Sequence, residues 1–181
     1  NAGVYIDKDQ FFARLAVDPE TIFEVYPEFL ISDEEYQNFL KERNSCIIGE
    51  ATAKLYNLKI GDLMNIDGDI YPGEWQFVVR GIYKPRDKTT DATQMLFHWD
   101  YLNERMKEWG TGRDNEVGWY IVKISDPEKT ASISEQIDAL FKNSRAETKT
   151  ESERAFQQGF VAASSAILTS INVISFVIIG I

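Results

Sequence analysis

Residues 48–62 have the sequence IGEATAKLYNLKIGD, and this stretch contains the local signals from which the fold can be predicted. The apolar residues 46–49 predict a short strand, and residues 50–56 predict a compact helix. The helix is expected to end before Gly61 and Asp62, where a glycine can adopt a left-handed turn. A strand, a helix and a glycine turn in close succession are typical of a domain that mixes α and β structure.

A predicted β-hairpin follows this stretch. Residues 63–67 are expected to pair with residues 74–83 across a turn at residues 68–73. Apolar side chains alternate along the second strand, at Trp75, Phe77 and Val79, which predicts that they share one face of a sheet. Residues 45–85 are therefore predicted to contain a β-rich lobe.

Strands and helices also alternate on both sides of this region. Ser32 and Glu35 form a capping box, and the apolar spacing after them predicts an amphipathic helix that ends near Arg43. Further strands are predicted at residues 4–6, 11–17, 94–99, 117–124 and 145–150, and further helices after Asp18-Pro19, at residues 101–109 and after Asp126-Pro127. The pattern predicts the α+β fold class.

The C-terminal segment carries no charge after Arg154. A helix over residues 160–181 would extend roughly 33 Å, close to the ~30 Å hydrocarbon core of a bilayer. We therefore expect residues 151–181 to be a linker and the beginning of a transmembrane helix, and residues 1–150 to be a folded body outside the membrane. Because the chain begins at Asn1 and stops inside an apolar run, we also expect it to be a piece of a longer protein.

Two faces of this predicted helix differ in chemistry. The apolar face is expected to contact lipid, and its residues are Phe160, Ile167, Ile171, Ile174 and Ile178. The face with small and polar side chains is expected to pack against other helices, and its residues include Ser165, Thr169 and Asn172. The same polar residues leave open an alternative, in which a long amphipathic helix packs on a water-soluble core.

The charge balance excludes one class of partner. The formal net charge is -10 and the isoelectric point is about 4.6. Nucleic-acid binding depends on clustered lysine and arginine, so we expect no nucleic-acid partner.

Few residues suggest catalysis. No phosphate-binding glycine motif is present, and Gly110-Thr111-Gly112 lacks the rest of a dinucleotide fingerprint. Cys46 and His98 are the single cysteine and the single histidine, and both occur in apolar strand-like contexts where a structural role is favoured over a thiol–imidazole pair. We therefore expect no enzyme activity, no catalytic residue, no metal site and no cofactor.

The order of these elements resembles the extracytoplasmic domain of the MacB and FtsX-like permease superfamily, which includes the lipoprotein-releasing permeases. Residues 48–62 resemble the recurring strand, helix and Gly-Asp turn of that family. Residues 77–83 look like the strand that leaves the inserted lobe, and residues 147–156 resemble the approach to the second transmembrane helix. The resemblance covers nearly the whole chain, and it implies a porter-like α/β lobe with an inserted β-rich lobe.

The resemblance also implies a function. Such a domain would lie in the periplasm at the bacterial inner membrane, or outside the cell where there is one membrane. Its partners would be an ATP-binding subunit, a second permease copy as a homodimer or heterodimer, and a periplasmic adaptor or lipoprotein substrate. It would couple ATP hydrolysis to export or release of a substrate or lipoprotein. The alternative is an FtsX-like signalling module that transports nothing and activates a cell-wall hydrolase.

Two aromatic residues near the predicted hairpin turn are candidate partner contacts. Tyr71 and Trp75 could be exposed there, because aromatic side chains dominate binding hot spots. Packing in the core is the alternative for both.

Overall fold

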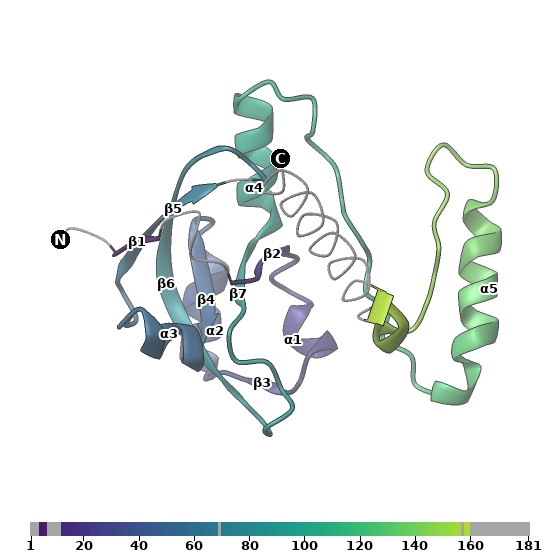
Figure 1. Cartoon of the computed structure of the whole chain (residues 1–181), viewed down its shortest axis with the longest axis horizontal. Coiled ribbons are helices and arrows are strands. Elements are labelled where there is room, and N and C mark those ends of the chain that lie inside the picture. Colours follow the sequence, from purple (N-terminus) through teal and green to yellow (C-terminus); the bar gives the residue numbers. More distant parts are fainter. Residues whose placement is uncertain (1–3, 7–11, 69, 157, 160–181) are drawn as a thin grey trace, which may run out of the picture. The chain divides into compact units, whose positions relative to one another are not determined.

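The computed structural model describes residues 4–6, 12–68, 70–156 and 158–159. The chain forms two compact units, Asn1–Val122 and Lys123–Ile181. The strands of the first unit are β1 (Val4–Ile6), β2 (Arg14–Val17), β3 (Phe29–Leu30), β4 (Ser45–Gly49), β5 (Leu63–Gly68), β6 (Gly73–Pro85) and β7 (Met95–His98) (Figure 1). Its helices are α1 (Ile22–Val25), α2 (Asp33–Lys41), α3 (Glu50–Leu55) and α4 (Trp99–Glu108). The mixed α+β class predicted from the sequence is confirmed.

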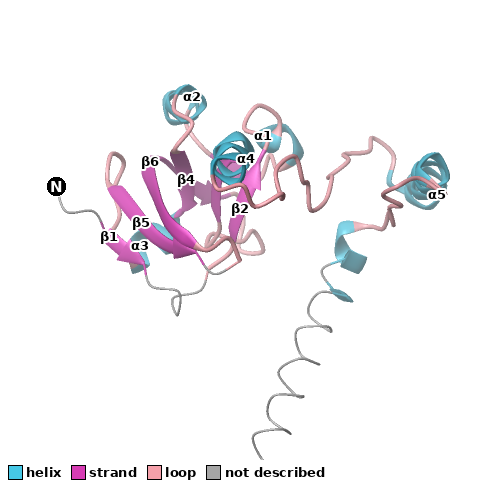
Figure 2. Ribbon diagram, turned by 90° about the horizontal axis from the view of Figure 1, so that it is seen from above, coloured by secondary structure: helices cyan, strands magenta, loops and turns pink. Residues whose placement is uncertain are grey.

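The strands of the first unit form one mixed sheet, drawn in magenta in Figure 2. Its order is β1-β5-β6-β4-β7-β2, and β3 pairs with β6 beside this path. Strand β4 is central, because it pairs in parallel with β6 and antiparallel with β7. All five of its residues are buried, which explains why its sequence is apolar without alternation. The predicted hairpin of β5 and β6 is also present, with Ile66 opposite Trp75.

The sheet has a hydrophobic core on each face. One core contains Cys46, Ile48, Phe77 and residues of α3 and α4, and the other contains Ile47, Tyr83 and residues of α1 and α2. Neighbouring residues of β4 enter opposite cores because successive side chains of a strand point to opposite faces.

Strand β6 contributes to both cores through a change of register. Cys46 lies opposite Val79, but Ile47 lies opposite Gly81, so Arg80 is an extra residue on β6. Trp75, Phe77 and Val79 therefore join the first core, as their alternation predicted, while Tyr83 joins the second. The Arg80 guanidinium donates to the Glu42 carboxylate with N–O distances of 2.7 and 2.9 Å.

Helix α2 begins at the predicted capping box. The Glu35 backbone N–H donates to the Ser32 hydroxyl (3.3 Å), and the Ser32 backbone N–H donates to the Glu35 carboxylate (3.2 Å). The second Glu35 oxygen accepts from the backbone N–H of Ile82 (3.1 Å). One side chain thus caps the helix and ties it to β6.

Two predicted strands are not formed in the described part of the chain. Residues 117–124 and 145–150 adopt no strand, and the first of these segments exposes several apolar side chains, including Tyr120 at 79% exposure. These predictions were wrong because the first segment was expected to be a buried strand from its apolar run, and a strand also needs a neighbour with which to pair, which a run of residues does not specify. Smaller differences occur at β7 and α4, which meet at His98 and Trp99 and leave no gap between strand and helix.

The second unit contains a short 3-10 helix (Pro127–Lys129) followed by α5 (Thr130–Phe141). The Asp126 side chain caps the 3-10 helix by accepting from the Glu128 N–H (3.1 Å), as its Asp-Pro sequence predicted. After α5, the backbone N–H of Thr150 donates to the Asp138 carboxylate on that helix (2.8 Å). A further helical turn covers residues 153–156.

No helix among the described residues is both long enough and apolar enough to cross a membrane. The residues expected to form the membrane helix, Phe160, Ser165, Ile167, Thr169, Ile171, Asn172, Ile174 and Ile178, all lie outside the described residues. That expectation, together with the predicted boundary at residue 150, stays a prediction.

Candidate functional site

The β5–β6 turn forms one side of a pocket. The indole N–H of Trp75 donates to the Tyr71 carbonyl (2.9 Å), which closes the turn. A Cβ atom at Gly68 would lie 2.2 Å from the same carbonyl oxygen, so this close approach requires glycine. The turn is thereby fixed in the shape that presents Tyr71 and Pro72.

The end of α4 forms the other side. Trp109 packs edge-on against Trp75, with ring centroids 5.3 Å apart. The Arg105 guanidinium lies 4.6 Å from the Trp109 ring centroid and donates to the Glu74 carbonyl (3.0 Å). Gly73 completes this contact, since a Cβ atom there would lie 2.7 Å from the Trp109 ring. The indole is therefore held in place by neighbours on β6 and on α4 itself.

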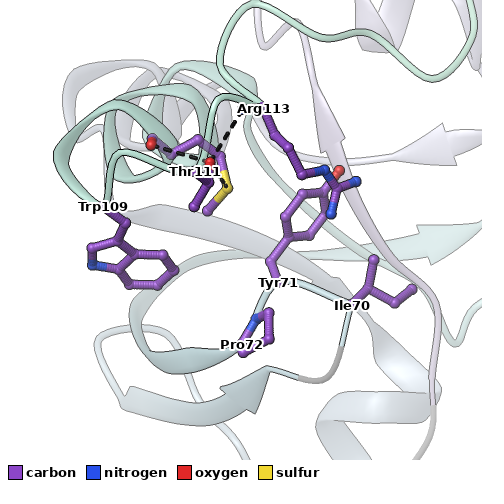
Figure 3. A pocket seen from close by; sticks show the side chains of 7 residues that line it. Ile70, Tyr71, Pro72, Trp109, Thr111 and Arg113 are labelled. Atoms are coloured by element: carbon purple, nitrogen blue, oxygen red, sulfur yellow. Dashed lines mark hydrogen bonds between the residues drawn. The ribbon is translucent and has the colours of Figure 1, made fainter.

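Between these two sides lies a pocket of about 390 Å³ (Figure 3). Its lining is mainly apolar and aromatic, from Ile70, Tyr71, Pro72, Met106, Trp109, Thr111 and Arg113. The Thr111 hydroxyl lies 3.3 Å from the Met106 carbonyl oxygen, and the backbone N–H of Arg113 donates to that hydroxyl (3.2 Å). These bonds shape the loop that carries Arg113 over the pocket.

Arg113 supplies a positive charge to this lining. Its guanidinium lies 4.7 Å from the centroid of the Tyr71 ring, a cation–π contact that Figure 3 shows. Its Nε atom is 3.5 Å from a Glu116 carboxylate oxygen, and both side chains are about half exposed. Such an exposed ion pair is weak, so Arg113 can exchange Glu116 for another anion.

The two residues predicted as partner contacts have different surroundings. Tyr71 lines the pocket, whereas Trp75 is 5% exposed and packs in the first core beneath it. Trp109, which is 37% exposed, and Arg113 were missed by the sequence analysis. The sequence does contain a signal for Trp109, because it stands directly before Gly110 at the end of a predicted helix. Apolar side chains at such helix ends often pack against the glycine turn that follows.

Cys46 and His98 are not brought together. Cys46 pairs with Phe97, so the side chain of His98 belongs to the opposite face of the sheet. Burial raises the pKa of the Cys46 thiol, which opposes formation of a thiolate nucleophile.

His98 has structural partners of its own. Its Nε2 atom lies 2.8 Å from the Phe39 carbonyl oxygen and 3.3 Å from the Ser45 hydroxyl, and its ring packs on Phe39 with centroids 4.4 Å apart. The Ser45 hydroxyl is itself within hydrogen-bond distance of the carbonyl oxygens of Phe39 (2.8 Å) and Glu42 (2.6 Å). Burial is the main cause that lowers the His98 pKa. Among the described residues, no group of three or more His, Cys, Asp or Glu side chains is placed to hold a metal ion.

Comparison with known protein families gives a match over most of the chain. Residues 9–140 match the family described as MacB-like periplasmic core domain, which is more than half of the chain. No curated protein matches the chain. Domains of this family belong to permeases of the ABC-transporter type, which work with ATP-binding subunits. The chain therefore belongs to the MacB-like periplasmic core domain family and is a permease component whose place is outside the cytoplasm.

Proposed function

We propose that this domain couples ATP hydrolysis by a partner ATP-binding subunit to the export or release of a substrate or lipoprotein. In this proposal it is the periplasmic part of a dimeric permease in the bacterial inner membrane, and it can contact an adaptor or a lipoprotein. The observation that carries the proposal is the family match over residues 9–140.

We also propose that the domain is not itself an enzyme. The burial of Cys46 and of His98 supports this, because a nucleophile and its base must reach a substrate. In the part of the chain that the structure describes, their side chains lie in separate cores, and His98 is engaged by Phe39.

The second unit has a feature suited to mechanical coupling. The Thr150 N–H is bonded to Asp138 on α5, and the Ser152 hydroxyl caps the next helical turn by accepting from the Ala155 N–H (3.3 Å). The backbone N–H of Phe156 then donates to the Ser152 carbonyl (3.0 Å). A displacement of this turn would reach α5 through only two intervening residues and the Thr150–Asp138 bond, and a short connection leaves less slack than a long loop.

A flexible insertion tests this coupling. A Gly/Ser segment placed after Thr150 should abolish substrate export in proteoliposomes that contain the full permease and its ATP-binding subunit, while ATP hydrolysis continues. The matched control is the same insertion between Ser144 and Arg145, which are exposed and precede the Thr150–Asp138 bond. That control should retain export.

Two results would contradict the proposal. Export that survives the insertion after Thr150 would show that no rigid connection is needed there. A full complex that exports nothing and instead stimulates a cell-wall hydrolase would replace transport by signalling as the function.

A further inference from the structure

The pocket beside the β5–β6 turn combines an aromatic lining with one cation. We propose that it binds small aromatic anions, that is, flat apolar ring systems carrying a carboxylate, sulfonate or phosphate group. This inference concerns binding by the first unit and does not depend on the coupling proposed above. It can therefore fail or succeed separately.

The size and lining of the pocket select the apolar part of the ligand. Small-molecule sites commonly enclose roughly 300–1,000 Å³, so a pocket of about 390 Å³ suits one or two fused rings. Figure 3 shows Trp109 and Tyr71 on opposite sides of the pocket, where each can contact a flat ring. Met106, 2% exposed, also lines it, and thioether sulfur packs well against aromatic rings.

The pocket is organised before any ligand arrives. Trp109 is held by Trp75, Arg105 and Gly73, and Tyr71 belongs to a turn closed by the Trp75 indole. Binding then orders few side chains, which lowers its entropic cost.

Arg113 selects the charged part of the ligand. A guanidinium offers a planar pair of N–H donors that matches carboxylate, sulfonate and phosphate oxygens. Its present partner Glu116 is held only by the weak 3.5 Å contact, so a ligand anion can take its place. The net charge of -10 is spread over the whole chain and is screened over roughly 10 Å, whereas a bound anion would contact Arg113 directly.

Calorimetric titration with naphthalene-2-sulfonate tests the proposal. The neutral isostere naphthalene-2-sulfonamide is the matched ligand, and the full chain in phosphatidylcholine nanodiscs is titrated against empty nanodiscs as the blank. We expect one saturable site with a dissociation constant below about 1 mM and about fivefold tighter binding of the sulfonate than of the sulfonamide. Absence of saturable binding in this range, or equal binding of both ligands, would overturn the proposal.

Variants assign the site. Arg113→Gln should remove the preference for the sulfonate, and Glu116→Gln should strengthen sulfonate binding about twofold while leaving the sulfonamide unchanged. Lys88→Gln, an equal loss of charge at an exposed position away from the pocket, should behave as wild type. Trp109→Leu should weaken the binding of both ligands. If Trp109→Leu unfolds at a lower temperature than wild type, Tyr71→Leu replaces it and should also weaken the binding of both ligands. Unchanged affinities in Arg113→Gln and Tyr71→Leu would place the binding elsewhere.

Discussion

Gly49 lies where β4 ends and α3 begins, and replacing it tests how closely the chain packs at this junction. Its backbone N–H donates to the Gln94 carbonyl (2.9 Å), and the Ala51 N–H donates to the Ala92 carbonyl (3.1 Å). The loop that carries Ala92 therefore crosses directly over the glycine. A Cβ atom at Gly49 would lie 2.0 Å from the Ala92 carbonyl oxygen and 2.9 Å from the Tyr83 hydroxyl.

The magnitude follows from what the added methyl group would meet. Because the Ala92 obstacle is backbone, Gly49→Ala must move the loop or break its two hydrogen bonds, and we expect a loss of about 3 kcal/mol in the free energy of unfolding. At Gly81 the nearest atom is the end of the Ile31 side chain, 2.7 Å away, which can rotate. Gly81→Ala should therefore cost only about 1 kcal/mol. Gly118 has nothing within 4 Å, so Gly118→Ala should change stability by less than about 0.5 kcal/mol.

Urea unfolding of the three variants and wild type, followed by far-ultraviolet circular dichroism, gives the comparison. From the most to the least stable, the expected order is Gly118→Ala, Gly81→Ala and Gly49→Ala. If Gly49→Ala lies within about 0.5 kcal/mol of Gly118→Ala, the close approach of the Ala92 loop does not constrain the junction as inferred.

The remaining predictions concern His98 and the capping box. Burial lowers the His98 pKa, so the unfolded chain takes up a proton first as the pH falls below about 6.5, and stability should decline from there down to the folded pKa. His98→Gln should flatten this decline in urea midpoints measured between about pH 5 and pH 8; an unchanged slope would assign it to other groups. Ser32→Ala should cost about 1 kcal/mol through loss of the cap, and Glu35→Ala about 2 kcal/mol because the Ile82 N–H also loses its acceptor. Equal losses in the same urea assay would mean that the Ile82 bond contributes nothing.

The parts of the fold that the sequence predicts are those whose signals are local. The capping box at Ser32 and Glu35 is formed by neighbours in the chain, and the alternation of Trp75, Phe77 and Val79 is a property of one strand. Residues 117–124 carry an equally clear strand pattern and form no strand, because pairing depends on a neighbour that the pattern does not specify. The extra residue Arg80, which moves β6 from one core to the other, likewise depends on its register with β4.

The pocket was only half predictable for the same reason. Tyr71 could be noted as an aromatic residue near a turn, but its partners Trp109 and Arg113 come from the end of α4 and the loop after it. No spacing in the sequence relates these positions, since they meet through the packing of α4 on the sheet. Trp75 was predicted correctly by a local signal, because the alternation of apolar residues along β6 placed it on the core face. Its nearness to the turn, which suggested exposure, was the poorer guide.

The pocket and the proposed coupling segment belong to different compact units, and this separation allows their roles to be distinguished. The pocket residues all precede Val122, whereas the Asp138–Thr150 bond lies after Lys123. If binding and coupling are independent, Arg113→Gln should change ligand affinity without changing ATP hydrolysis by the full complex, and the insertion after Thr150 should abolish export without changing ligand affinity. If the aromatic anion itself altered ATP hydrolysis in wild type, and Arg113→Gln removed that effect, the pocket would be coupled to the ATP-binding subunit. If the insertion after Thr150 abolished the same effect, the second unit would carry the signal, and if the effect survived that insertion, the signal would take another route.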